Sequence, residues 1–374
     1  MIKFEKVRKI YSDGTEAIKG ISFEVEKGEF CILLGPSGCG KTTTMKMINR
    51  LIPISEGKIY INGQDNTKID ENKLRRGIGY AIQQIGLFPH MTVKENIQTV
   101  PVLREWPKEK IEKRVKELMY LIGLDPSIYL KKYPAELSGG EMQRIGVARC
   151  LGADPPILLM DEPFGSIDPI NRGKLQDEFL KIQAKIKKTI IFVTHDIDEA
   201  IKMGDKIVLM KEGEIVDYDT PSNLLYRPKN EFVRNFVGTD RALKGLQLMR
   251  VKEIMDSSPK IVRADEEITE AKSYMEQEKI RWLIVVDDNH RFIGWLGRAD
   301  LDNKKVKEVR DIMIPPTVSA TAETPLNEAL SLMLSSAVGN LAIVDDKNKL
   351  EGIVDFNSIR SVLEKIYNSR EGQK

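Results

Sequence analysis

The stretch Phe30-Cys31-Ile32-Leu33-Leu34, followed directly by Gly35-Pro36-Ser37-Gly38-Cys39-Gly40-Lys41-Thr42, decides the fold of the first part of the chain. The consecutive apolar residues predict a buried strand, and the residues after them fit the pattern GxxxxGK[ST] and open a helical stretch. Glycines let the backbone turn so tightly that several N–H groups point at one phosphate chain, and the helix start adds a favourable dipole. The sequence therefore predicts a strand, a phosphate-binding loop and a helix in direct succession.

The side chains of this loop have predictable tasks toward a nucleoside triphosphate. We expect Lys41 to reach the β- and γ-phosphates and the Thr42 hydroxyl to ligate Mg²⁺. ATP and Mg²⁺ are therefore the expected ligands. The residues expected to hold the nucleotide here are Gly35, Pro36, Ser37, Gly38, Cys39, Gly40, Lys41, Thr42 and Thr43.

Three more apolar runs predict buried strands, at Ile157–Met160, Ile190–Thr194 and Lys206–Met210. Helical patterns lie between them, and apolar strands that alternate with helices indicate a parallel sheet covered on both faces. Residues 94–123 are helical and highly charged, which predicts a helical subdomain inserted in the sheet domain at about residues 87–155. The fold class expected for the first part is therefore α/β.

Two carboxylates follow the apolar run Ile157–Met160. Asp161 and Glu162 would lie at the carboxyl end of a strand, which is where α/β sheets bind ligands. We expect Asp161 to hold Mg²⁺ through a water molecule of its coordination shell. Glu162 is the candidate base that polarises the attacking water.

Composition limits the choice of partners. A net charge of +2, from 58 basic and 56 acidic side chains among 374 residues, gives no overall field that attracts nucleic acid, so we expect no nucleic-acid partner. The chain has three cysteines, an odd number that does not indicate a disulfide framework, and we expect Cys31 and Cys150 in the core. No apolar run approaches the roughly 18 residues that span a bilayer. We therefore expect a cytoplasmic protein, peripheral on the inner face of the cell membrane.

The last part of the chain contains an internal repeat. Ile254-Met255 is matched by Ile312-Met313, Asp287-Asp288 by Asp345-Asp346, and Gly294 by Gly352, always 58 residues further on. Each copy predicts a β-α-β-β-α unit. Two such units side by side indicate a pseudo-symmetric module with a cleft at its axis.

Leu137-Ser138-Gly139-Gly140-Glu141, located between the phosphate-binding loop and the acidic strand end, resembles the signature motif of the ABC family of ATPases. Other positions resemble further family motifs in the expected order. Tyr11 resembles the aromatic residue that stacks on adenine, and Gln83 the Q-loop glutamine, a Mg²⁺ ligand and hinge. Asp168 resembles the D-loop acid, in a motif that has Ile167 where Leu is commoner, and His195 resembles the switch histidine. The resemblance covers about residues 1–236.

This resemblance implies an ATP sandwich between two copies of the domain. Lys41, Glu162, His195 and Gln83 of one copy would act on an ATP that Ser138, Gly139 and Gly140 of the other copy complete. It also implies permease transmembrane subunits, which in importers of this family dock near Leu87–Val93, and indirectly an extracellular or periplasmic solute-binding protein. A soluble ABC ATPase that acts on DNA or ribosomes is the alternative, and the short insertion, the single domain and the near-neutral charge count against it.

The repeat resembles a tandem pair of CBS domains, of α+β type. We expect an ABC domain at 1–238, a linker at 239–250 and CBS domains at 251–309 and 310–370. An ABC ATPase with this appendage resembles the ATPase subunits of importers for glycine betaine, carnitine and choline. Import of another small solute is the alternative.

CBS pairs of this kind commonly bind adenine nucleotides, and Arg298, Asp300 and Arg360 are the candidate contacts. Ser358 stands where copy two would need its acid, so the resemblance points to cyclic di-AMP between two subunits as the alternative to AMP or ATP. Salt sensing through Lys304, Lys305, Lys307 and Arg310 is another possibility. A dimerisation device without ligand is the simplest one.

Overall fold

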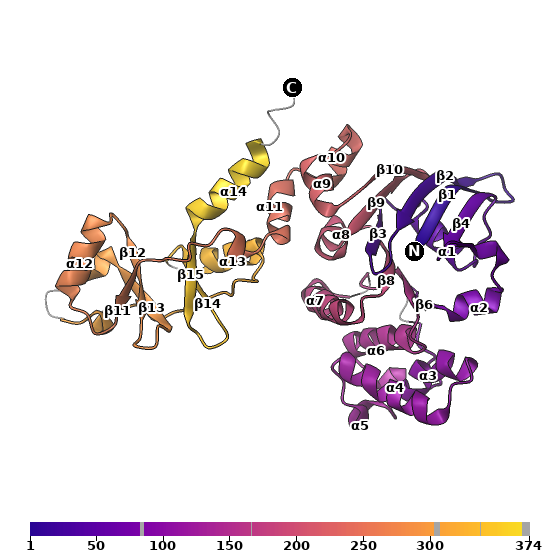
Figure 1. The fold of residues 1–374 in the computed structure, drawn as a ribbon, viewed down its shortest axis with the longest axis horizontal. Coiled ribbons are helices and arrows are strands. Elements are labelled where there is room, and N and C mark those ends of the chain that lie inside the picture. Colours follow the sequence, from indigo (N-terminus) through magenta and orange to yellow (C-terminus); the bar gives the residue numbers. More distant parts are fainter. Residues whose placement is uncertain (83–85, 166, 303–306, 337, 369–374) are drawn as a thin grey trace. The chain divides into compact units, whose positions relative to one another are not determined.

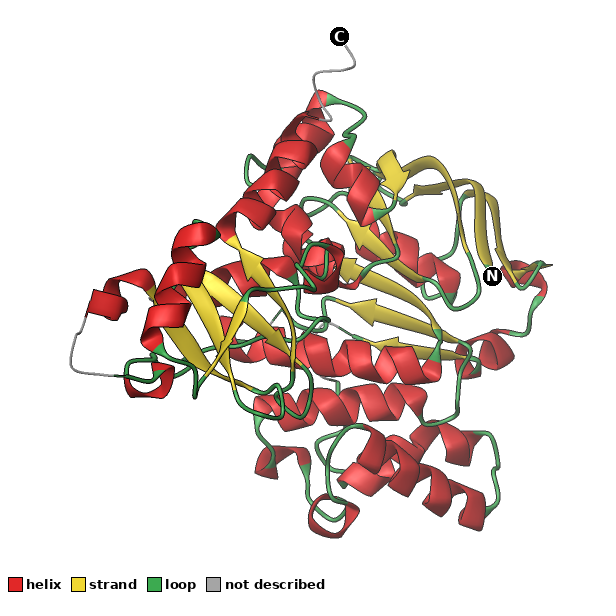
Figure 2. Ribbon diagram, turned by 60° about the vertical axis from the view of Figure 1, so that its left-hand side comes forward, coloured by secondary structure: helices red, strands yellow, loops and turns green. Residues whose placement is uncertain are grey.

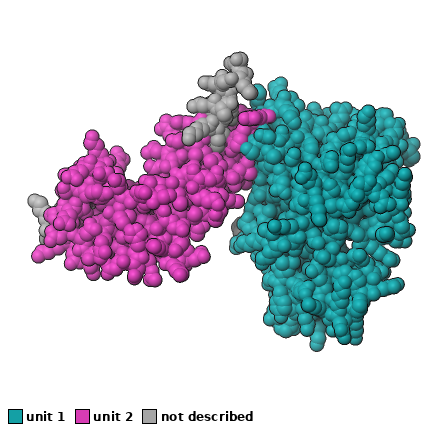
Figure 3. All heavy atoms as spheres, viewed as in Figure 1, with its two compact units in different colours: residues 1–224, 228–236 teal, residues 225–227, 237–374 magenta. Residues whose placement is uncertain are grey.

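The computed structural model describes residues 1–82, 86–165, 167–302, 307–336 and 338–368, and the chain divides into two compact units (Figure 3). Unit 1 comprises residues 1–224 and 228–236, and unit 2 comprises residues 225–227 and 237–374. The phosphate-binding motif lies in unit 1, and the 58-residue repeat lies in unit 2.

A six-stranded sheet forms the centre of unit 1 (Figures 1 and 2). Its strands, in spatial order, are β10 (Glu214–Asp219), β9 (Lys206–Lys211), β3 (Phe30–Leu34), β8 (Thr189–Thr194), β7 (Ile157–Asp161) and β6 (Ile78–Ala81). All neighbours are parallel except the edge strand β10. Every residue of β3, β7 and β8 is buried, as continuous apolar runs require when helices cover both faces. The four strands predicted from apolar runs and the α/β fold class are confirmed.

The register of this sheet brings distant motifs to one edge. Leu34 pairs with Thr194, and Asp161 pairs with Val193, so β3, β7 and β8 end at the same level. The residues that follow them in sequence must therefore leave the sheet side by side. This edge is the carboxyl end of the parallel strands, where such sheets bind ligands.

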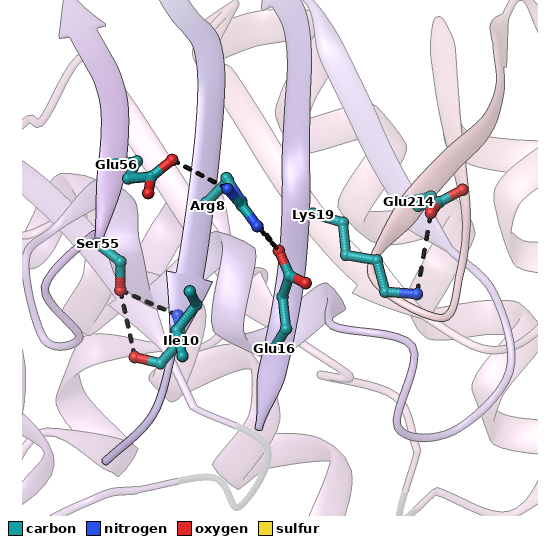
Figure 4. A network of polar contacts seen from close by, with 7 residues as sticks. All are labelled: Arg8, Ile10, Glu16, Lys19, Ser55, Glu56 and Glu214. Carbon is teal, nitrogen blue, oxygen red and sulfur yellow. Dashed lines mark hydrogen bonds and ion pairs between the residues drawn. The ribbon is translucent and has the colours of Figure 1, made fainter. Parts of the chain in front are cut away.

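A smaller antiparallel sheet contains β2 (Glu16–Val25), β1 (Ile2–Ile10), β4 (Glu56–Ile61) and β5 (Gln64–Asp65) in this order. Figure 4 shows the polar contacts at its end: Arg8 binds Glu16 at 2.6 Å and Glu56 at 3.2 Å on the two neighbouring strands. Ser55 Oγ accepts a hydrogen bond from the Ile10 N–H at 2.9 Å and donates one to the Ile10 carbonyl. These contacts fix the end of β1, from which Tyr11 projects.

The helices of unit 1 form two groups. Those associated with the strands are α1 (Lys41–Ile48), α2 (Glu71–Arg76), α7 (Pro169–Ile186), α8 (Ile197–Met203), α9 (Pro221–Tyr226) and α10 (Glu231–Val237), with the 3₁₀ turn η1 (Asn66–Lys68). The helical subdomain contains α3 (Val93–Leu103), α4 (Lys108–Leu121), α5 (Pro126–Tyr129), η2 (Pro134–Glu136) and α6 (Gly139–Leu151). Helix α4 is strongly charged but buries Ile111, Val115, Leu118 and Met119 on one face.

Unit 2 has the repeat that the sequence predicts. Helix α12 (Ile268–Gln277) and helix α13 (Leu326–Ser335) differ by 58 residues at both ends. The same offset relates the remaining paired elements: β12 (Trp282–Val286) to β14 (Asn340–Val344), β13 (Phe292–Gly297) to β15 (Leu350–Asp355), and the start of η5 (Arg298–Asp302) to the start of α14 (Phe356–Asn368). Strand β11 (Ile261–Arg263) completes the first sheet, whose order is β11-β12-β13.

The two copies exchange segments across their pseudo-symmetry axis. Asp256, near the start of copy one, pairs with Ile353 of β15, and the equivalent Ile314 of copy two pairs with Trp295 of β13. Gly294 and Gly352 permit this approach, because a Cβ at either would lie 2.7 Å from the carbonyl oxygen of the exchanged segment. Residues of both copies then share one core: Ile284, Val286, Phe292, Trp295, Ala342, Val344 and Leu350. The copies therefore fold as one module.

The expected linker 239–250 has structure of its own. It contains α11 (Arg241–Gly245) and η3 (Leu246–Leu248), and Leu246 is fully buried in the core around α13. The segment belongs to unit 2, which contains residues 237–374. The short turns η4 (Val251–Glu253) and η6 (Val309–Asp311) begin the two copies. In the described part of the chain, no helix is long and apolar enough to cross a bilayer.

Candidate active site

The loop after β3 is shaped by its glycines. Gly35, Gly38 and Gly40 have φ angles of +147°, +79° and +104°, in the region that glycine adopts without strain. A Cβ at Gly35 would collide with the carbonyl oxygen of Met210, and one at Gly40 would lie 2.9 Å from that of Ala17. The backbone thus folds tightly into the start of α1, as the pattern predicts.

Lys41 is 5% exposed, and its ammonium group is held by the loop itself. Nζ donates to the carbonyl oxygens of Gly35 at 2.7 Å and Pro36 at 2.9 Å, and lies 3.8 Å from Cys39 Sγ. These contacts place a positive charge inside the loop, where a phosphate chain needs one. Burial raises the pKa of the Cys39 thiol, with Lys41 opposing, so this cysteine is a packed residue and a poor nucleophile.

Thr42 and Asp161 come together although 119 positions separate them. Thr42 Oγ1 donates to Asp161 Oδ1 at 2.9 Å, since α1 begins at the edge where β7 ends. Asp161 is 4% exposed, and burial raises its pKa, while the bond from Thr42 acts in the opposite direction. A hydroxyl and a carboxylate beside the loop are oxygen ligands of the type that Mg²⁺ prefers. The residues present therefore fit the group that the motif implies.

Glu162 and His195 form the next pair. His195 Nδ1 lies 3.2 Å from Glu162 Oε1, and the imidazole is more than half exposed. Glu162 has a φ of +43°, which is uncommon for a residue with a side chain, and its N–H donates to the Val193 carbonyl at 3.0 Å. The backbone of the strand end thus turns the carboxylate toward the histidine and toward solvent.

Tyr11 reaches the same region from the antiparallel sheet. Its hydroxyl lies 3.4 Å from Thr43 Oγ1 in the first turn of α1, and its ring lies under Lys9 Nζ at 5.1 Å from the centroid. The ring is partly exposed. The structure thus brings Tyr11 to the start of α1, beside the loop that the sequence assigns to phosphate binding.

The signature motif belongs to the helical subdomain. Ser138 caps α6 through a capping box with Glu141, whose carboxylate accepts from the Ser138 N–H at 2.7 Å and from Tyr129 at 2.6 Å. A Cβ at Gly139 would meet nothing within 4 Å, and one at Gly140 only Leu175 at 3.9 Å. Their own chain therefore leaves these glycines uncovered. Among the described residues, no hydrogen bond joins this helix start to the loop 35–42.

The remaining sequence-predicted residues are distributed as follows. Asp168 caps α7, accepting from the Asn171 N–H at 3.1 Å. Gln83 lies outside the described residues. In unit 2, Arg298 starts η5 and faces Glu276 at 3.8 Å, Arg360 binds Glu364 at 2.8 Å, and the Asp300 side chain lies outside the described part.

Sequence reasoning missed two residues that shape the loop after Gly86. Asn96 on α3 is fully buried; its Oδ1 accepts from the Phe88 N–H at 2.8 Å, and its amide donates to three loop carbonyls. Arg149 of α6 donates to the Gly86 carbonyl and covers the Phe88 ring at 5.7 Å. The only available signal was a polar residue, Asn96, within the buried stripe of α3.

The fold and this edge of the sheet define a P-loop ATPase. Comparisons with known proteins make the class specific. A family model described as "ABC transporter" matches residues 18–165, and the CBS domain model matches residues 251–305 and 309–365. The glycine betaine/carnitine/choline transport ATP-binding protein OpuCA of Bacillus subtilis is 45% identical over 100% of this chain and 99% of its own length. The osmoprotectant import ATP-binding protein OsmV of Salmonella typhimurium is 45% identical over 97% of this chain and 96% of its own.

Among solved structures, the dimeric ATP-binding cassette MJ0796 bound to ADP and Pi is 31% identical, covers 59% of this chain and 99% of its own, and gives a TM-score of 0.53. The chain belongs to the ATP-binding subunits of ABC transporters and carries a tandem pair of CBS domains. It is an ATPase, and subunits of this family dimerise and work with permease subunits.

Proposed function

We propose that this ATPase drives the import of compatible solutes of the glycine betaine, carnitine or choline type through permeases in the cell membrane. The ATPase itself binds peripherally on the inner face of that membrane. One observation carries the solute class. Relatives whose names specify these solutes match the chain at 44–46% identity over 97–100% of its length, through the ATPase unit and the CBS module alike. A solute-binding protein outside the membrane would deliver the cargo.

Within unit 1, we assign the phosphoryl chemistry to the edge of the six-stranded sheet. Lys41 and the loop N–H groups hold the phosphates, Thr42 directly and Asp161 through water hold Mg²⁺, and Gln83 is a further ligand. When bound, Mg²⁺ neutralises charge that develops on the γ-phosphoryl group. Glu162 orients the attacking water, and His195 stabilises the departing γ-phosphoryl group. The 3.2 Å contact between the last two supports their joint assignment.

The signature residues act on the partner copy. The uncovered Gly139 and Gly140 offer N–H groups at the start of α6, where an anion is favoured. The Ser138 hydroxyl, which donates to Glu141 Oε2 at 2.9 Å, lies beside them. Asp168 lies at the start of α7 as a further contact between copies. The dimeric ADP-bound cassette of the same fold supports a head-to-tail homodimer.

The permease docks at Leu87–Val93. Asn96 and Arg149 stabilise this loop in one conformation, and Phe88 remains partly exposed in it. Because Arg149 belongs to α6 and Ser138 caps the start of this helix, a displacement of the loop is transmitted along one helix to the signature motif. This connection supports coupling between cargo movement and ATP closure.

The CBS module dimerises through copy two. At equivalent positions, copy one has the ion pair Glu276–Arg298, whereas copy two has Leu334, 70% exposed, and Phe356, 40% exposed. Since copy one folds with charges at these positions, the fold does not require apolar residues there. Exposed apolar side chains of this kind are typical of an interface. A second copy of the chain therefore covers the surface formed by Leu334 and Phe356.

Cyclic di-AMP is the regulatory ligand that we favour for the module, with Arg298, Asp300 and Arg360 as contacts. In copy two, Ser358 donates its hydroxyl to Asp355 at 2.7 Å, so it does not replace the acid of copy one. The two copies therefore differ at this position, since copy one has Asp300 and copy two has Ser358. This difference favours a ligand held between two subunits and counts against AMP or ATP held in each cleft.

The transport assignment is tested in proteoliposomes that contain this chain, its permease subunits and the binding protein. We expect ATP-dependent uptake of labelled glycine betaine, carnitine or choline, and none by a complex with Glu162→Gln. Uptake of an unrelated solute such as histidine, with none of the three, would overturn the cargo and retain the importer.

A further inference from the structure

Glu199 is a buried carboxylate that the assigned chemistry does not use. It lies in the first turn of α8, four residues after His195, and is 6% exposed. Burial raises its pKa, and the hydrogen bond from Thr194 opposes this shift. An acid in a first helical turn usually stabilises an exposed helix end. A buried one must have specific partners, because a carboxylate without them is costly to bury.

The first partner lies next to His195. Thr194 Oγ1 donates to Glu199 Oε2 at 2.6 Å and accepts from the Asp196 N–H at 3.0 Å. Thr194 and Asp196 are the residues on either side of His195. Glu199 therefore orients the one hydroxyl that closes the turn from which the histidine projects.

The second partner comes from another helix. Gln176 of α7 donates through Nε2 to Glu199 Oε1 at 3.1 Å. Arg172 of α7 and Asp196, which caps α8, are the other charged groups near the carboxylate. A carboxylate accepts on both oxygens, so it joins two donors at once, whereas an amide has one accepting oxygen and one donating NH₂ group. Asp168 caps the start of α7, so Glu199 connects the end of β8 to the helix that follows the D-loop.

We propose that Glu199 is a positioning residue: through Thr194 it holds His195 against Glu162, and it acts on ATP hydrolysis only through His195. This inference rests on the proposed role of His195. In a Ser-His-Asp triad, an acid orients the catalytic histidine by binding its imidazole ring directly. Here the acid, Glu199, instead fixes the backbone turn that carries His195 and does not bind the ring.

A double-mutant cycle on the full-length chain tests the proposal by steady-state ATPase. We expect Glu199→Gln to lower kcat about tenfold, the effect typical of a residue that orients a catalytic group, with the KM for ATP within about twofold. In a His195→Ala background the same substitution should change kcat less than about twofold, because its target is gone. The inference is overturned if Glu199→Gln lowers kcat by the same factor in the wild-type and His195→Ala backgrounds. It is also overturned if Glu199→Gln does not lower kcat in the wild-type background.

Two further variants protect the test against misfolding. Thr194→Val removes the same hydroxyl contact from the other side and should reproduce the loss, and Thr194→Ser should restore most of it. Asp217→Asn changes a buried carboxylate of β10 that is bound to Lys229, and should lower the melting temperature without changing kcat. If His195→Ala alone leaves kcat intact, the proposed site and this inference both fail. If His195→Ala lowers kcat but the effects of the two substitutions are independent, this inference alone fails.

Discussion

At the residue scale, the site depends on the atoms that the ends of β3, β7 and β8 bring together. The 2.9 Å bond between Thr42 and Asp161 and the 3.2 Å contact between Glu162 and His195 lie beside one glycine loop. Phosphoryl transfer needs positioned charge more than covalent chemistry, so small changes of single atoms should separate ATP binding from ATP hydrolysis.

Glu162→Gln keeps the volume of the side chain and removes the carboxylate that orients water. We expect kcat to fall by at least about 100-fold, the contribution typical of a general base, while ATP still binds. Phosphate release and equilibrium binding of a fluorescent ATP analogue measure the two properties. Full turnover in this variant would show that another group activates the water.

Asp161→Asn should stabilise the nucleotide-free protein while impairing hydrolysis. Burial raises the pKa of Asp161, so the folded state binds a proton more readily than the unfolded chain, and ionisation at neutral pH destabilises the fold. Asn can still accept the Thr42 bond. We expect the melting temperature at pH 7 to rise by about 2–4 °C, the shift that roughly 1 kcal/mol gives in a domain of this size. The gain should shrink as the pH falls and wild-type Asp161 becomes protonated; a gain that grows instead would contradict the assigned direction of the pKa.

At the element scale, the sequence predicted those features whose signal is contiguous. The apolar runs of β3, β7, β8 and β9 and the loop 35–42 each carry their pattern within a few residues, and the parallel register then places their ends together. The repeat also defined the paired elements of unit 2, since one offset relates them.

Features that depend on one side chain in a distant core could not be predicted. Leu246 is buried in the core of unit 2, and Asn96 and Glu199 are buried polar residues. Their partners are defined only by tertiary structure. Gln83 falls outside the described residues, and the role of Ser138 concerns a second copy, so both stay predictions.

The loop Leu87–Val93 provides an element-scale prediction. Asn96→Ala removes the hydrogen bonds to Phe88, Met91 and Thr92, and we expect the loop to lose its defined conformation. Affinity for the permease should fall at least about tenfold, since partly buried backbone groups of the loop lose their hydrogen-bond partner. The ATPase activity of the chain alone should stay within about twofold. Co-purification and surface plasmon resonance measure the affinity. Thr99→Ala, on the same helix, is the matched control, and equal permease binding by both variants would argue against docking at this loop.

At the scale of the whole molecule, the two copies of the repeat provide their own control. Leu334→Glu combined with Phe356→Arg gives copy two the charges that copy one has at Glu276 and Arg298. We expect the module to fold, because copy one tolerates these residues, and the nucleotide-free chain to sediment as a monomer. Lys252→Ala, which removes a surface ion pair with Glu323, should remain dimeric. A dimeric double variant would place the interface on another face.

The central claim is that one chain contains two halves of different ATP sites, and a heterodimer tests it most directly. One chain carries Glu162→Gln and the other Ser138→Ala, with two different tags for purification, in the assembled complex. One of the two sites then contains both defects and the other contains none. The account predicts about half of the wild-type ATPase rate, because paired copies exchange the same surfaces. A rate no higher than the mean of the two homodimeric variants would contradict a site shared between copies.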